Sequence, residues 1–151
     1  MPGQATVVIG DKSWSCSVAS LSSEIVSGLS GVEGIAAETG MLFDMGTDYE
    51  HIDINTSEML FSLDIIFINS GGQVVEVLHD VEPNESAFFD AGEGLGAKYF
   101  MEINSGEATS VSVGDTAVID YTQEGLSLGS ILGLVVVAGM AGMMMRSTLK
   151  R

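Results

Sequence analysis

Residues 63–68 read Leu-Asp-Ile-Ile-Phe-Ile, an apolar run that one carboxylate interrupts. A short apolar run rich in β-branched and aromatic residues, bounded by turn residues, is typical of a β-strand. Ser70-Gly71-Gly72 follows the predicted strand at Leu63–Asn69. Glycine accepts the positive φ angles of tight turns, so this tripeptide predicts a hairpin into a second strand at Gln73–Leu78.

The rest of the first 121 residues has the same short-strand character. Ala5–Val18 predicts another hairpin, because Trp14, Cys16 and Val18 alternate with serines and so share one buried face. Ser20–Leu29 is the best helix candidate outside the C-terminal region, with serines available as N-cap. Further strands are expected at Gly40–Met45, His51–Asn55, Lys98–Ile103 and Val118–Tyr121.

Many short strands and one short helix predict a mainly β fold rather than an alternating β/α fold. We expect a small β-barrel-like domain, closed or nearly closed, over residues 1–121. Cys16 is the single cysteine of the chain and lies on the apolar face of its strand. It is therefore interpreted as a small core residue rather than a nucleophile.

Charge is distributed very unevenly along the 151 residues. The chain has 21 acidic and 5 basic residues, for a net charge of −16. All 21 acidic residues lie between Asp11 and Glu124, a stretch whose basic residues are Lys12 and Lys98, so it carries −19. Phosphate recognition needs clustered Lys and Arg, so direct nucleic-acid binding by this domain is excluded. The mutual repulsion of these carboxylates is screened at high salt, and a basic protein surface would attract them, so the charge predicts either salty surroundings or a basic partner.

The segment after the acidic domain has the features of a membrane span. Leu126–Met145 reads LSLGSILGLVVVAGMAGMMM, twenty residues without a charge. At ~1.5 Å per residue this helix would reach ~30 Å, the thickness of the bilayer hydrocarbon. We expect a single transmembrane helix at 126–145, joined by a linker at 122–125 and followed by a basic tail at 146–151. A buried C-terminal helix is the alternative.

Small residues four apart recur within this predicted span. Gly129 and Gly133 form a G-x-x-x-G motif, and Ala138 with Gly142 repeats the spacing. Such positions let two helices approach closely in lipid. They predict self-association or docking to other membrane-protein subunits.

The predicted anchor also bears on topology. By the positive-inside rule the basic tail, with Arg146, Lys150 and Arg151, stays interior and the acidic domain lies outside. The N-terminal sequence MPGQATVVIGDK has no charged region followed by an apolar one, so it does not resemble a cleavable signal peptide. These two observations conflict, and an exterior domain is only slightly favoured.

Two groups of polar residues are candidates for a site. His51, Asp53 and Asn55 would project from one face of a strand and could hold a divalent cation, with Ca²⁺ better suited than Zn²⁺. A solvated polar face is the alternative. Asp64, if buried, needs a hydrogen-bond partner. It is a ligand-binding candidate together with His79 or His51, or else a structural acceptor of backbone N–H groups.

Several blocks of the chain resemble the DUF192 (UPF0127) family over about residues 5–121. They are Gly28-Leu29, Gly40-Met41-Leu42-Phe43, the 63–68 strand, Gly72-Gln73-Val74-Val75, Pro83 and Gly114-Asp115. The resemblance implies a compact β-rich domain with one short helix, often exported or lipid-anchored in prokaryotes, with no activity established for the family.

This chain departs from the family pattern at polar positions. Asn55-Thr56-Ser57-Glu58-Met59 stands where the family usually has Trp-Met-Lys-Asn-Thr, and Ser62 stands in place of a Pro. The Arg that usually follows the Gly-Leu pair is also absent, since Ser30 follows Leu29.

The sequence therefore favours a non-catalytic structural or interaction module. It would be anchored in a cell-envelope or virion-type membrane in several copies, without a required cofactor. The alternative is a domain that binds a small ligand or divalent cation, or a weak hydrolase, through Asp64 with His51 or His79.

Overall fold

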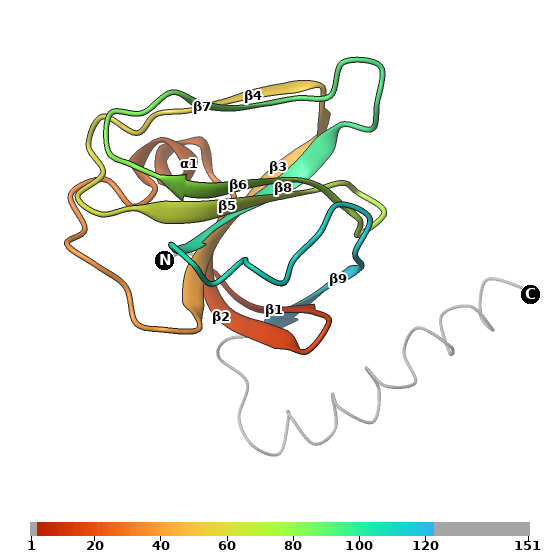
Figure 1. Cartoon of the computed structure of the whole chain (residues 1–151), viewed down its shortest axis with the longest axis horizontal. Helices are drawn as coiled ribbons and strands as arrows, with labels where there is room; N and C mark the ends of the chain where they lie inside the picture. Colours follow the sequence, from red (N-terminus) through yellow and green to blue (C-terminus); the bar gives the residue numbers. More distant parts are fainter. Residues whose placement is uncertain (1–2, 123–151) are drawn as a thin grey trace, which may run out of the picture.

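The computed structural model describes residues 3–122 as a mainly β domain with one short helix, as expected (Figure 1). Its elements are β1 (Gly3–Ile9), β2 (Lys12–Ala19), α1 (Ser22–Ser27), β3 (Thr39–Tyr49), β4 (His51–Ile54), β5 (Leu63–Ile68), β6 (Val74–Val81), β7 (Ala87–Asp90), β8 (Ala97–Asn104) and β9 (Ala117–Thr122).

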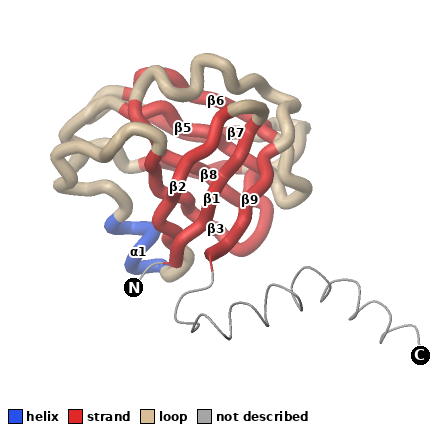
Figure 2. The backbone as a smooth tube through the Cα atoms, turned by 90° about the horizontal axis from the view of Figure 1, so that it is seen from below, coloured by secondary structure: helices blue, strands red, loops and turns tan. Residues whose placement is uncertain are grey.

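Seven of these strands form one sheet in the order β6-β5-β8-β3-β2-β1-β9. Neighbours are antiparallel except β2 and β3, which are parallel and are joined through α1. β4 and β7 form a separate two-stranded sheet. Figure 2 shows β2, β1 and β9 side by side at one end of the larger sheet. This order brings the first and last described strands into contact.

The sequence predicted a barrel-like sheet, closed or nearly closed, and the larger sheet is not a closed barrel. Its edge strands, β6 and β9, do not pair with each other, and an isolated antiparallel bridge joins Gln73 and Thr116, the residues just before them. The reason is geometric. Beyond this bridge each strand meets the turn that precedes the other, where Val74 N–H donates to Asp115 and Ala117 N–H donates to Gly72. The sheet therefore remains open beyond this bridge.

The central strands β3, β5 and β8 are covered on both faces, which gives the domain two cores. The cluster around Trp14, Leu42, Ile66 and Met101 is called the first core, and β1, β2 and β9 cover it. The second core contains Phe43, Phe67 and Phe100 with Ile52 and Phe89 of the small sheet. In Figure 1, α1, β4 and β7 lie on this second side of β5 and β8. All six residues of β5 are buried for this reason.

The predicted features of the C-terminal region lie outside the described residues. These are the transmembrane helix at 126–145, the association motif at Gly129, Gly133, Ala138 and Gly142, and the basic tail at 146–151. Of the predicted linker at 122–125, Thr122 is described and ends β9. Within residues 3–122 no helix has the length and apolarity needed to cross a membrane.

At Gly40 the backbones of β3 and β8 leave no room for a side chain. A Cβ atom at this position would lie 2.6 Å from the carbonyl oxygen of Glu102 and 2.8 Å from Cγ2 of Ile103. Any side chain would push the two central strands apart. We expect Gly40→Ala to lower the free energy of unfolding by about 1–3 kcal/mol, the usual cost of overpacking. Urea denaturation of the variant and the wild type measures this difference.

Gly3→Ala is the matched control, because a Cβ there would meet only Cβ of Val18 at 3.8 Å. Equal urea midpoints for the two variants would contradict the close-approach explanation.

Candidate functional site

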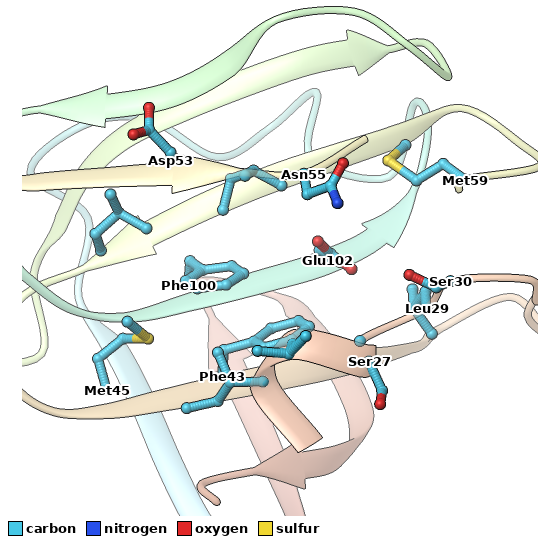
Figure 3. A pocket seen from close by; sticks show the side chains of 15 residues that line it. Ser27, Leu29, Ser30, Phe43, Met45, Asp53, Asn55, Met59, Phe100 and Glu102 are labelled. Carbon is cyan, nitrogen blue, oxygen red and sulfur yellow. The ribbon is translucent and has the colours of Figure 1, made fainter. Parts of the chain in front are cut away.

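A cavity of about 230 Å³ lies between α1, β3, β4 and β8 (Figure 3). Most of its wall is apolar and comes from the second core and the side chains around it. The apolar part includes Phe43, Met45, Ile52, Ile54, Met59 and Phe100. The polar side chains around it are Ser27, Ser30, Asp53, Asn55 and Glu102. A concave, mainly apolar site with a few polar groups is the usual form of a small-molecule site.

The end of α1 shapes one wall of this cavity. The helix stops at Gly28, whose φ of +46° is a conformation that favours glycine. A Cβ atom on Gly28 would lie 3.2 Å from Cζ of Phe43, so glycine also lets the chain pass close to this ring. Leu29 and Ile25 then pack against the second core. The helix thus contributes wall residues from its last turn and from the segment that follows.

Glu102 is the polar group that stands out in the cavity. Its residue is only 6 % exposed, and no side-chain hydrogen bond within residues 3–122 involves its carboxylate, whose oxygens keep access to the cavity because no fully buried side-chain oxygen there lacks a partner. It shares a face of β8 with Phe100, and its register partners are Met41 and Ile65. Figure 3 shows the carboxylate amid the lining side chains, with Phe100 on one side and Leu29 and Ser30 on the other. Burial raises the pKa of Glu102 from 4.5 to about 7.

No residue of opposite charge accompanies Glu102 in this wall. The described lining contains no Lys, Arg or His. Asp53 reaches the lining from β4, but its side chain is 80 % exposed and contacts His51 instead. Glu102 is therefore the one carboxylate that faces the cavity interior.

Asp64 lies on the opposite face of the sheet, away from this cavity. It is 1 % exposed, and its two carboxylate oxygens accept backbone N–H groups from Asp80, Gly106 and Ala108, each at 2.9 Å. Nδ1 of His79 lies 3.8 Å from Oδ2 of Asp64. The structure thus places Asp64 beside His79, but the Asp64 oxygens already connect β6 to the turn that follows β8.

The predicted cation ligands are brought together only in part. Nε2 of His51 lies 3.0 Å from Oδ1 of Asp53, and Nδ1 of His51 lies 3.8 Å from Asp90. Oδ1 of Asn55 accepts hydrogen bonds from the backbone and hydroxyl of Ser57. Within residues 3–122 no group of three or more His, Cys, Asp or Glu side chains has metal-binding geometry. A Ca²⁺ site here stays a prediction.

Glu102 was not among the residues that the sequence singled out. Lys98, Phe100 and Glu102 alternate on one face of β8, and charged residues on either side of an aromatic one are typical of a solvated face. Burial arises because α1 and β4, which are distant in sequence, cover this face. The alternation of residues in β8 alone therefore did not indicate that Glu102 is buried.

Cys16 has no part in the cavity. Its side chain is fully buried in the first core, where its thiol lies 3.6 Å from the sulfur of Met101. Burial raises the pKa of the Cys16 thiol to about 12, which leaves the nucleophilic thiolate unpopulated at neutral pH.

The sequence profile of the DUF192 family, described as an uncharacterized ACR, matches residues 5–119. The chain belongs to the DUF192 family. No curated protein matches it.

Two crystal structures show the same fold. One is a protein from Sinorhizobium meliloti 1021 named as a candidate transcription regulator, with a TM-score of 0.67 and 23 % identity over 79 % of this chain and 94 % of that one. The other is a protein of unknown function from Novosphingobium aromaticivorans DSM 12444, with a TM-score of 0.66 and 22 % identity over 76 % and 83 % of the two chains. At these identities the likeness extends to the fold alone.

Blocks that carry the resemblance to DUF192 meet at the cavity. Gly28 and Leu29 come from the first block, and Phe43 ends the second. Positions at which this chain departs from the family pattern are also present in the wall, among them Ser30 and Asn55. The cavity wall thus contains both residues of the blocks that resemble the family and residues at which this chain departs from the family pattern.

The raised pKa of Glu102 predicts a pH-dependent difference in stability. Because the folded pKa exceeds the ordinary value, ionisation of Glu102 destabilises the fold as pH rises from 4.5 through 7. We expect Glu102→Gln to raise the free energy of unfolding at pH 8 by about 3 kcal/mol, the energy of a pKa shift of this size. Little gain is expected at pH 4, where Glu102 is protonated in both states. Urea denaturation at both pH values measures the gain.

Glu93→Gln serves as control, since it removes one negative charge from an exposed turn. If Glu102→Gln changed the free energy of unfolding no more than Glu93→Gln at both pH values, the result would contradict a destabilising effect of the buried, ionised carboxylate.

Proposed function

We propose that this DUF192 domain is a non-catalytic module that binds a small, partly apolar molecule in the cavity between α1, β3, β4 and β8. The observation that carries the proposal is the buried Glu102 carboxylate, which faces an apolar cavity without a protein partner in the described chain. Within residues 3–122 no fully buried side-chain oxygen lacks a hydrogen-bond partner, so the Glu102 oxygens reach the open space of the cavity. A ligand in the cavity can therefore contact this carboxylate directly.

A binding role is favoured over catalysis by the composition of the wall. Its described residues include no His, Cys, Lys or Tyr that would serve as base or nucleophile beside Glu102. The alternative of a weak hydrolase at Asp64 with His79 or His51 has less support, because the Asp64 oxygens are occupied by three backbone N–H groups. His51 contacts Asp53 and Asp90 rather than Asp64.

We propose further that the domain is held at a membrane by residues 126–145. Twenty consecutive uncharged residues support this, and β9 ends at Thr122, so the linker would keep the domain near the bilayer. The domain would lie on the exterior side with the basic tail inside. Gly129, Gly133, Ala138 and Gly142 would bring several copies together, or join the chain to other membrane subunits.

Blocking the cavity tests the binding proposal. Ser27 is an exposed serine of α1 that lines the cavity, and Ser27→Trp should fill its mouth without entering the core. We expect small aromatic fragments, screened as cationic, neutral and anionic sets, to shift NMR signals of β3, β4 and β8 in the wild type. The shifts should disappear in the Ser27→Trp variant.

Ser23→Trp is the matched control, because Ser23 is an exposed serine one turn earlier on the same helix and does not line the cavity. This variant should bind like the wild type. The proposal fails if no fragment of any charge binds, or if Ser27→Trp and Ser23→Trp bind equally well.

Membrane attachment is tested by alkaline extraction of cells that express the full chain. We expect the full chain to stay in the membrane pellet, because an apolar span resists extraction that releases peripheral proteins. A variant that ends at residue 125 should appear in the supernatant. Release of the full chain by the same treatment would contradict the anchor. Mass determination of the detergent-solubilised protein then gives the copy number.

A further inference from the structure

We propose that the ligand of the Glu102 cavity is a small amphiphilic cation, with an amine or quaternary ammonium group on a compact apolar body. This inference rests on the proposed function and adds the charge and shape of the ligand. The ammonium group would meet the Glu102 carboxylate, and the apolar body would fill the space along Phe43, Phe100 and Ile52.

The charge of the ligand follows from what the cavity lacks. Glu102 is buried, and the described wall offers no Lys, Arg or His to neutralise it. A second carboxylate in this space would face an uncompensated like charge, which makes an anionic ligand unfavourable. A neutral hydroxyl would supply one hydrogen bond, whereas a cation supplies a charge-assisted bond, the stronger of the two.

The charge of the whole domain acts in the same direction. Residues 3–122 contain two basic residues, Lys12 and Lys98, and 20 acidic ones, because Glu124 lies outside this range. Nζ of Lys98 lies 4.8 Å from the centre of the Tyr99 ring, and neither lysine lines the cavity. A surface of one sign raises the local concentration of ions of the other sign. Cations are therefore concentrated at the mouth and anions are repelled.

The wall beside Glu102 suits the apolar part of such a ligand. Phe43 and Phe100 stack with their ring centres 4.2 Å apart and their planes within 9°. Both rings line the cavity, and Figure 3 shows them near the Glu102 carboxylate. Aromatic side chains attract ammonium groups through the ring quadrupole, and more strongly where water is excluded. A carboxylate next to aromatic rings is thus a suitable receptor for an organic ammonium ion.

Size limits the ligand to a small molecule. The cavity of about 230 Å³ is below the ~300–1,000 Å³ typical of sites for drug-sized ligands. A single ring or a short branched chain with one ammonium group fits this limit. A peptide, a nucleotide or a lipid with two acyl chains does not.

Probes that share one phenylethyl body and carry head groups of three different charges test the inference. They are 2-phenylethylamine, 2-phenylethanol and 3-phenylpropionate, titrated calorimetrically at pH 8 against the full chain in phosphatidylcholine nanodiscs, with empty nanodiscs as the blank. We expect the amine to bind about tenfold more tightly than the alcohol, which is the advantage of a charge-assisted hydrogen bond. The propionate should bind most weakly.

Variants separate the role of Glu102 from that of the apolar wall. Glu102→Gln keeps the size of the side chain and should reduce the preference for the amine over the alcohol to about onefold. Ser30→Arg places a competing cation at the same wall and should weaken the amine more than the alcohol. Ser30→Met, of similar length but uncharged, is its control and should keep the preference of the wild type.

The outcomes distinguish the two proposals. Equal binding of amine and alcohol to the wild type would overturn the cationic ligand while leaving a binding cavity in place. An amine preference that survives in both Glu102→Gln and Ser30→Arg would overturn Glu102 as its source. Absence of binding by all three probes, together with the failure of the fragment sets, would overturn the proposed function itself.

Discussion

Burial of β3, β5 and β8 on both faces is the constraint on which the rest of this domain depends. Any polar side chain on these strands must find its partner away from bulk water. Asp64 and Glu102 lie on the neighbouring strands β5 and β8 and face opposite cores. Asp64 meets the constraint with three backbone N–H groups and so fastens the turns around it. Glu102 has a cavity in place of such donors, and this difference separates a structural carboxylate from a candidate binding group.

Much of the secondary structure was predictable because it follows from the local order of apolar, polar and turn residues. The 63–68 strand, its Gly-Gly turn and the Trp14–Val18 alternation all appear in the structure. β7 was missed, since it has only four residues and depends on pairing with β4, more than 30 residues away. Of the two expected forms, closed or nearly closed, the closed barrel does not form, because the relative position of two edge strands follows from no local pattern. The site was missed for the same reason: only the packing of α1 and β4 buries Glu102.

The cavity also gives a physical meaning to the motifs that carry the family resemblance. Gly28 is needed where the chain leaves α1 beside the Phe43 ring, and Gly40 is needed where β3 approaches the backbone of β8 at Glu102. Gly28 therefore sets the spacing between two walls of the cavity, whereas a Cβ on Gly40 would point into the first core, toward Cys16 and Ile103. Ser30 and Asn55 also line the cavity, and Asn55 in addition accepts hydrogen bonds from the backbone and hydroxyl of Ser57.

The pairing of β1 with β9 has a consequence for how the protein is made. Residues 3–9 of β1 leave the ribosome well before residues 117–122 of β9, so one of the two edges of β1 is covered only when β9 arrives. Until then the nascent β1–β2 hairpin presents a row of unpaired N–H and C=O groups, which is a template for pairing with a neighbouring chain. On a crowded polysome, the interval between synthesis of the first and last strands is thus the period in which this protein is most exposed to aggregation.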